Sequence, residues 1–192
     1  MNLRFNFALV LLLSACATVQ VTPVSSYSSA TKQHLYKLDK WAFEGRVSIT
    51  NQSDSWTANI DWQHFVGKEK IRLSGPLGQG ATVIDLADDF VTIDHGGGNK
   101  QSSRYPEAFI GQQVGLYVPV QSLRFWVVGV PESEGRFEEI GNGFVQDGWL
   151  IEYQQMQAVA EESLPRKITV KNDKVKLKLV IDQWVINDVN AR

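Results

Sequence analysis

The chain of 192 residues has no second cysteine, because Cys16 is the only one it contains. A disulfide within the chain and a zinc site built on several cysteines are therefore excluded. The three histidines, His34, His64 and His95, do not have the spacing of a metal site either. We expect neither a bound metal nor any other cofactor.

A strong excess of one charge is also missing. The chain has 19 Lys and Arg against 21 Asp and Glu, which gives a net charge of −2 without a long run of like charge. An electrostatic surface for nucleic acid is therefore not expected. The hydrophobic content of 43% and charged content of 21% are typical of one ordinary globular domain.

Catalytic motifs are not found. No G-x-S-x-G motif occurs, and the glycine-rich segment 78–81 lacks the Gly-Lys-Ser/Thr of a phosphate loop. The paired carboxylates Asp88-Asp89, Glu138-Glu139 and Glu161-Glu162 are adjacent in sequence at turns or connections, where solvated surface positions are the simplest interpretation. We therefore predict that the protein is not an enzyme.

The N-terminus has the pattern of a signal peptide over residues 1–15. Arg4 provides the positive region, and the apolar run 7–13 is shorter than the roughly 20 residues of a membrane span. The segment Leu13-Ser14-Ala15-Cys16 resembles the lipobox of bacterial lipoproteins. That resemblance implies cleavage before Cys16 and acylation of this cysteine; the alternative is a plain secretory signal with a stray cysteine.

Residues 16–30 are interpreted as the lipidated N-terminus and a tether of little fixed structure, rich in Ser, Thr and Val. In enterobacterial lipoproteins an aspartate after the cysteine retains the protein in the inner membrane. Ala17 stands at that position here. By resemblance, this predicts a lipid-anchored protein on the periplasmic face of the outer membrane.

Residues 31–192 are predicted to form a single domain. A short helix is expected over 32–40, after which apolar residues recur with a period of two and predict about ten or eleven antiparallel strands. Two short helices interrupt the strands, one after Pro106 and one over 118–129, which has Pro119 near its start and Gly129 near its end. Residues 157–165 are expected to be a connection with some helical propensity.

A sheet of this size tends to curl, and helices at its mouth would leave a concave apolar interior. Strand parity and the apolar face of the second helix predict a cavity for an apolar ligand. The expected lining residues are Phe43, Trp62, Phe109, Leu123, Trp126, Trp149 and Ile151. The alternative is that these side chains fill an ordinary core.

The segment Ser74-Gly75-Pro76-Leu77-Gly78-Gln79-Gly80 is predicted to be a surface turn between two strands. Its central side chain is Leu77. This leucine either folds back onto the sheet or is exposed, as many leucines are at little cost.

Several segments together resemble the LolB family of outer-membrane lipoprotein receptors. They are the lipobox, a Trp-rich antiparallel meander, the Pro76-Leu77-Gly78 loop between strands and a P-x-x-S-L-R-x-W-x-x-G-x-P segment at 119–131. The C-terminal residues 176–179 and 184–186 also fit. The similarity covers nearly all of the chain after the tether.

The resemblance implies a mainly β fold, an incomplete, half-open antiparallel β-barrel with a helical lid over a cavity for acyl chains. It further implies a receptor that accepts acylated lipoproteins from a LolA-like periplasmic carrier and inserts them into outer-membrane lipid. In this family the loop leucine is exposed and needed for insertion, a role that carries over to Leu77. We expect a monomer.

Two other functions stay open on the sequence. One is an envelope lipoprotein with a filled core that serves as a structural or assembly module, and the other is an envelope hydrolase with an unrecognised site. Arg46 and Arg124 are compatible with ligand gating and equally with exposed or structural roles.

Overall fold

The computed structural model describes residues 20–75 and 78–186. Within these ranges the chain forms three short helices, η1 (Ala30–Lys37, a 3-10 helix), α1 (Pro106–Val114) and α2 (Val120–Val128). The strands are β1 (Val21–Pro23), β2 (Lys40–Asn51), β3 (Ser55–Phe65), β4 (Lys68–Ser74), β5 (Thr82–Ala87), β6 (Phe90–Asp94), β7 (Lys100–Ser103), β8 (Phe137–Ile140), β9 (Gly143–Gln146), β10 (Trp149–Val159), β11 (Glu162–Lys171) and β12 (Val175–Ile186).

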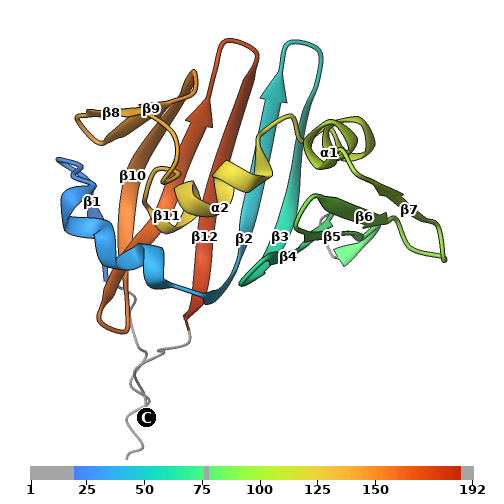
Figure 1. Ribbon diagram of the computed structural model, residues 1–192, viewed down its shortest axis with the longest axis horizontal. Coiled ribbons are helices and arrows are strands. Elements are labelled where there is room, and N and C mark those ends of the chain that lie inside the picture. The colour runs from blue at the N-terminus through green and yellow to red at the C-terminus, as the bar shows by residue number, and fades with distance from the viewer. Residues whose placement is uncertain (1–19, 76–77, 187–192) are drawn as a thin grey trace, which may run out of the picture.

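All twelve described strands belong to one antiparallel sheet (Figure 1). The order is β7-β6-β5-β4-β3-β2-β12-β11-β10-β9-β8, and β1 pairs with β10 beside this path. Between the described strands β7 and β8 there is no pairing, so the curled sheet stays open. The predicted half-open antiparallel fold is confirmed, and β1 is the strand that the sequence did not reveal.

The tether prediction was wrong for the segment that follows residue 20. Strand β1 pairs along β10, with Thr22 opposite Met156. Tyr27 is buried, and its hydroxyl donates a 3.1 Å hydrogen bond to the carbonyl oxygen of Gly129. The Ser- and Thr-rich composition hid these contacts, because only the fold provides the open length of β10 on which β1 pairs.

The predicted connection at residues 157–165 was also wrong. Strand β10 continues to Val159, and a tight turn with Ala160 at φ 52° leads directly into β11. The register between β10 and β11 shifts between Tyr153 and Met156. This irregularity changes which residues of β10 face inward, so the alternation is interrupted in the sequence and does not look like a strand.

A close approach of β2 and β12 shapes the centre of the sheet. The register shifts between Ile181 and Gln183, which lets Trp184 face the interior although it stands three residues after Ile181. Opposite this bulge, a Cβ on Gly45 would collide with the carbonyl oxygen of Val180. Glycine is therefore required at this position.

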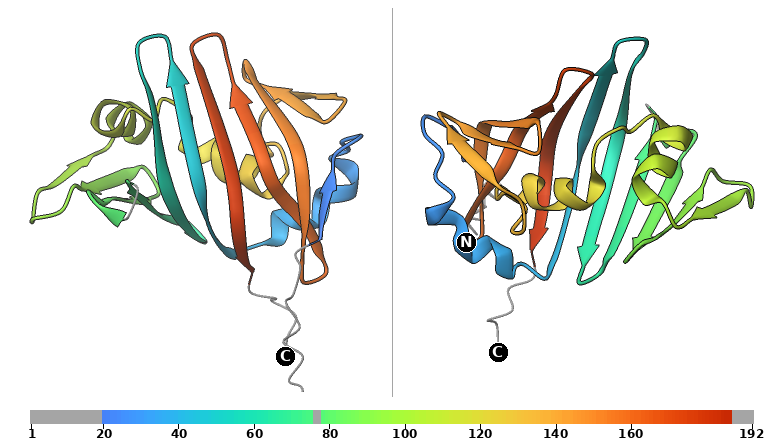
Figure 2. Two further views of the ribbon diagram at one scale, coloured as in Figure 1. Left: turned by 180° about the vertical axis from the view of Figure 1, so that it is seen from behind. Right: turned by 45° about the horizontal axis from the view of Figure 1, so that its top comes forward.

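The helices lie on one side of the sheet (Figures 1 and 2). α2 crosses the concave face, α1 lies near β6, and no described helix crosses the convex face seen from behind. The predicted apolar face of α2 is confirmed: Leu123, Trp126 and Val127 are buried, and Gly129 ends the helix at φ 105°. The expected N-terminal helix is the 3-10 helix η1.

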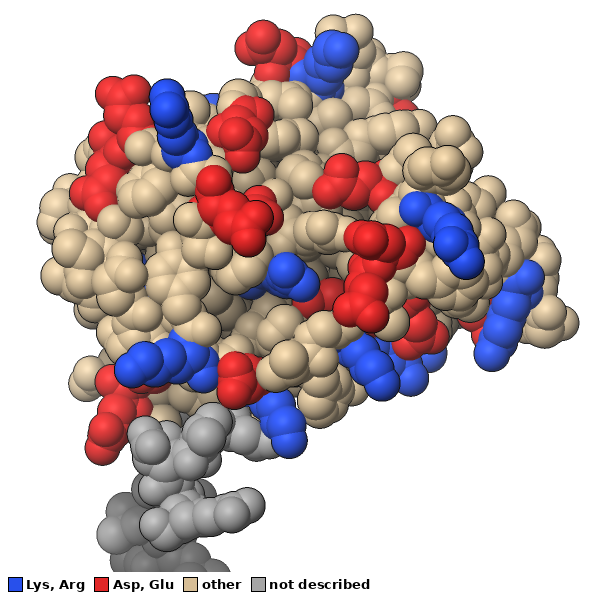
Figure 3. All heavy atoms as spheres, viewed as in Figure 1, with Lys and Arg blue, Asp and Glu red and all other residues tan. Residues whose placement is uncertain are grey.

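The charges on the face that carries α2 are mixed. Lys and Arg side chains lie singly or in small groups among Asp and Glu (Figure 3). Of the helices in the described ranges, none has both the length and the apolar character needed to cross a bilayer.

Candidate functional site

An enclosed apolar cavity lies between α2 and the concave face of the sheet. Every side chain that lines it is apolar: Val47, Trp56, Ile60, Trp62, Ile71, Leu73, Leu116, Leu123, Leu177 and Leu179. Its volume is about 10 Å³, which is close to the minimum for one water molecule. The space between α2 and the sheet is therefore almost filled by protein side chains.

Only two of the seven predicted lining residues border this cavity. They are Trp62 on β3 and Leu123 on α2. Phe43 lies on β2, the strand that contributes Val47 to the cavity wall, but its ring packs against Trp41, Trp62 and Trp184, with ring centroids 5.1 to 6.0 Å apart. Parity correctly placed Phe43 inside the sheet, but adjacent aromatic rings cover it.

The other four predicted residues lie elsewhere. Trp126 and Ile151 are fully buried, and Trp149 is half-buried, with its ring centroid 6.2 Å from that of Trp126. Phe109 is half-buried on α1. They form part of the wider apolar core under the helices and do not line the small cavity.

The C-terminal end of α2 is fixed by buried polar groups. The Tyr153 hydroxyl donates to the Trp126 carbonyl oxygen at 2.9 Å, and the Trp126 indole donates to Oε1 of Gln146 at 2.9 Å. Burial raises the pKa of Tyr153 well above its usual value, so this hydroxyl stays protonated. Since Gln146 also exchanges two hydrogen bonds with the Glu132 backbone, the chain just beyond the helix is held as well.

A buried carboxylate connects the sheet to the lid. Glu69 on β4 is 3% exposed, and its two oxygens accept from the Trp62 indole at 2.7 Å and pair with Nδ1 of His64 at 2.6 Å. An Nη1 atom of Arg124, on α2, lies 3.9 Å from the same carboxylate. We call these four residues the Glu69 cluster. It is the charged link between α2 and the sheet wall that borders the cavity.

Arg124 is incompletely satisfied in this arrangement. Its Nε is buried and has no hydrogen-bond partner within the described residues, while its guanidinium lies 4.9 Å from the centroid of the Phe125 ring. A buried donor without a partner costs about 1–3 kcal/mol. The observed position of α2 therefore combines an electrostatic attraction to Glu69 with a local desolvation cost. Arg46, in contrast, forms an exposed ion pair with Asp182.

The Glu69 cluster was missed by the sequence interpretation, although the signal was present. Glu69 stands two residues before Ile71, and His64 two residues after Trp62, so both are on the inward parity of their strands. A charged residue at an inward position is unusual and needs a partner. The second signal, Arg124, lies 55 residues after Glu69 in the sequence, and only the fold brings the two side chains together.

Leu77 and Cys16 lie outside the described residues, so their proposed roles stay predictions. The described ends of the turn around Leu77 are well defined: the Gly75 amide donates to Gln79 at 2.9 Å, and the Gly78 amide donates to Gly75 at 3.0 Å. Gly78 and Gly80 have φ values of 76° and 64°. These left-handed conformations explain the glycines of the turn.

The described part of the chain contains no group of three or more His, Cys, Asp or Glu side chains that could hold a metal ion. The Glu69 cluster joins a carboxylate to an imidazole, but Oε2 of Glu69 accepts from the Trp62 indole, and Arg124 lies near Oε1, the oxygen that pairs with His64. What this region offers is an apolar interior, a helix that covers it and one charged contact between the two.

Comparison with known proteins identifies relatives of this chain. The family model described as "Outer membrane lipoprotein LolB" matches residues 39–184. The Outer-membrane lipoprotein LolB of Chromohalobacter salexigens is 34% identical over 93% of this chain and 88% of its own length. The LolB protein of Marinomonas sp. is 30% identical over 93% of this chain and 95% of its own. A solved LolA superfamily protein from Nitrosomonas europaea aligns over 80% of this chain and 88% of its own, with a TM-score of 0.46 and 8% identity.

Proposed function

Because this chain belongs to the LolB family of outer-membrane lipoproteins, we propose that it accepts acylated lipoproteins from a LolA-like periplasmic carrier and inserts them into the outer membrane. In this proposal Cys16 carries the lipid anchor and residues 1–15 are removed. The acyl chains of the cargo occupy the space between α2 and the sheet. Leu77 enters the lipid surface during delivery.

The observation that carries the proposal is the wholly apolar lining of the cavity under α2. Such a lining suits hydrocarbon, since burying each methylene is worth about 0.8 kcal/mol. The cavity volume of about 10 Å³ means that cargo binding includes an outward movement of the lid. Burial of the acyl chains supplies the free energy for that movement. The lipoprotein then passes to whichever partner binds it more tightly, and nucleotide hydrolysis is not needed.

The nearly filled interior also favours a second candidate, an envelope module with a permanent core and no cargo. The two functions differ in one measurable property. A receptor binds an apolar fluorescent probe under α2, and an acylated peptide displaces that probe from the site. A module with a filled core does not bind the probe.

The test compares one peptide in acylated and non-acylated forms as competitors for the probe, using the mature chain. The receptor predicts displacement by the acylated form alone. A Trp126→Asp variant places a carboxylate in the fully buried site of Trp126 and is expected to lose probe binding or folding. Equal affinity for both forms of the peptide would contradict a lipid-binding receptor and favour the module.

A further inference from the structure

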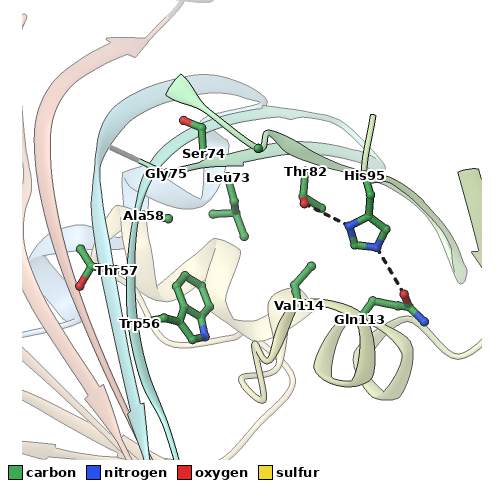
Figure 4. Close-up of a pocket in the computed structure, with 11 residues that line it drawn as sticks. Trp56, Thr57, Ala58, Leu73, Ser74, Gly75, Thr82, His95, Gln113 and Val114 are labelled. Carbon is green, nitrogen blue, oxygen red and sulfur yellow. Dashed lines mark hydrogen bonds between the residues drawn. The ribbon is translucent and has the colours of Figure 1, made fainter. Parts of the chain in front are cut away.

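A side hollow opens on the protein surface next to the enclosed cavity (Figure 4). It lies between β3, β4, β5 and the C-terminal end of α1, and its volume is about 240 Å³. Trp56, Leu73 and Val114 point toward one another around it, and Thr82, His95 and Gln113 form one side. We call this space the side hollow.

The side hollow shares a wall with the enclosed cavity. Trp56 and Leu73 line both spaces. Trp56 is half-buried on β3, so movement of this one side chain and of the α1 end would connect the surface with the interior. The side hollow is therefore placed as an entrance to the cavity.

The charge of the lining separates this hollow from three others on the described surface. No Asp, Glu, Lys or Arg lines the side hollow. Each of the other three is lined by at least two such residues, among them Arg46, Asp182, Asp88 and Arg124. An acyl chain that enters through the side hollow does not have to desolvate a charged group, which would be costly.

The way α2 is fixed also indicates that the cavity opens toward the side hollow. Its C-terminal end is held by Tyr153 and Gln146. The cavity, however, lies under Leu123 and Leu116, which belong to the N-terminal half of α2 and to the connection from α1. Movement of α1 with this connection would open the side hollow while the anchored end stays in place.

The rim of the side hollow offers hydrogen-bond donors without charge. His95 bridges Thr82 at 3.2 Å and Oε1 of Gln113 at 3.3 Å. With Nε2 of the imidazole donating to Gln113, the amide nitrogen of Gln113 keeps both of its hydrogens for another acceptor. Neither this nitrogen nor the indole nitrogen of Trp56, which lies beside Gly115 at the end of α1, has a hydrogen-bond partner among the described residues.

We propose that the side hollow is the entrance for cargo and holds the ester- and amide-bearing head of an acylated N-terminal cysteine. The acyl chains pass Trp56 into the interior, and the head's uncharged carbonyl oxygens accept hydrogen bonds from Gln113 and Trp56. This inference rests on the proposed receptor function and adds the place and the chemistry of head recognition.

The first experiment maps where the head lies. A synthetic peptide carries a diacylglyceryl, N-acylated cysteine followed by a benzophenone amino acid, and it is photo-cross-linked to the otherwise unaltered mature chain with Cys16 replaced by alanine. Mass spectrometry is expected to find the cross-links on β3, β5 and α1 around Thr57 and Gln113. Cross-links concentrated beside Arg124 and Asp88 would overturn the entrance while leaving the receptor function intact.

The second experiment removes the head contact. Gln113→Leu is expected to weaken binding of the same lipopeptide about three- to tenfold, since a neutral hydrogen bond is lost, and to leave binding of the hydrocarbon pyrene unchanged. Gln121→Leu, a matched change on α2 in a charged hollow, should change neither. Unchanged lipopeptide affinity in a folded Gln113→Leu protein would contradict head recognition there.

The two proposals fail in different ways. If the parent protein binds pyrene but no lipopeptide, the receptor function is wrong and the entrance falls with it. If the parent binds the lipopeptide and both glutamine variants behave alike, only the entrance is wrong. If the Gln113→Leu protein does not fold, the cross-linking experiment still tests the entrance, because it uses a chain in which Gln113 is unchanged.

Discussion

The indole nitrogen of Trp62 donates a 2.7 Å hydrogen bond to the buried carboxylate of Glu69. Trp62 lines the apolar cavity, and the same carboxylate lies 3.9 Å from Arg124 on the lid helix. The wall of the cavity and its cover are thus connected through one acidic side chain. A substitution of Glu69 is therefore expected to affect both the cavity wall and the helix α2 that covers it.

Glu69→Gln is therefore predicted to loosen the lid. The substitution removes the charge that attracts Arg124 and weakens the contact with His64, so we expect faster entry of an apolar fluorescent probe and a stability loss of about 1.5–3 kcal/mol. Stopped-flow fluorescence and urea unfolding measure the two effects. Glu138→Gln, an exposed carboxylate on β8, is the matched control. An unchanged entry rate in a destabilised Glu69→Gln protein would mean that the cluster only supports the fold.

The hydrogen bond from Tyr153 to Trp126 is predicted to fix the C-terminal end of α2. Tyr153→Phe removes only the hydroxyl and should cost about 0.5–1.5 kcal/mol of stability, with faster hydrogen exchange in residues 126–130. Tyr105→Phe is the control, because the Tyr105 side chain is 77% exposed and its loss should change stability by less than about 0.5 kcal/mol. If hydrogen exchange becomes faster mainly around Leu116, then Tyr153 does not fix the C-terminal end of α2.

Leu77→Glu is predicted to separate acceptance from delivery. If the side chain projects into water, stability should stay within about 0.5 kcal/mol of the parent. Transfer from the carrier to the variant should proceed, because it depends on the cavity, and transfer from the variant to liposomes should fail, because the glutamate would have to be desolvated. Gln79→Glu adds the same charge to the same turn and should still deliver. A stable Leu77→Glu protein that delivers at the parent rate would remove the role of this leucine.

Cys16 is predicted to be an anchor without a part in the fold. A non-lipidated secretory leader together with Cys16→Ala should therefore yield a folded protein that is soluble in the periplasm. Cell fractionation and circular dichroism check both properties. An unfolded product, or one that still sediments with membranes as an integral protein, would show that the body depends on its lipid.

The N-terminal segment around Ser29 is predicted to pack less stably against β8 at acid pH. Hydrogen bonds from the Ser29 hydroxyl and amide to Glu139, at 2.6 and 2.8 Å, lower the pKa of this carboxyl below that of an ordinary glutamate. A lowered pKa contributes stability that is fully present above the unfolded-state pKa and is lost as the pH falls through the lower folded-state pKa. The effect is small, because the carboxyl is exposed and screened by solvent.

Urea unfolding between pH 2 and 6 measures this contribution. Glu139→Gln should unfold with a shallower pH dependence than the parent, and the two curves should approach each other at the acid end. Glu138→Gln serves again as the control, since its neighbour's bonds to Ser29 stay intact. Parallel curves for Glu139→Gln and the parent would mean that this contact does not contribute to the docking of the segment.

Local patterns in the sequence were sufficient for most of the fold. Alternation in the Trp41 to Thr50 segment predicted a strand because a strand repeats every two residues, and Pro119 with Gly129 delimited α2 because their backbone restrictions are intrinsic. The same patterns failed where the partner strand decides. β1 and the β10–β11 turn exist because β10 offers an open edge and a shifted register, which no local pattern encodes.

The site divides along the same line. The sequence by itself determined that Trp62 and Leu123 face the interior, because periodicity decides which side of a strand or helix is apolar. Only the tertiary structure decided that they share a cavity while Phe43 does not, because contact depends on how neighbouring strands curl and which aromatic ring lies between. It also decided that Glu69 meets Arg124, and that Gln113 and Trp56 border one hollow, since residues distant in the chain become neighbours only when the sheet curls beneath its helices.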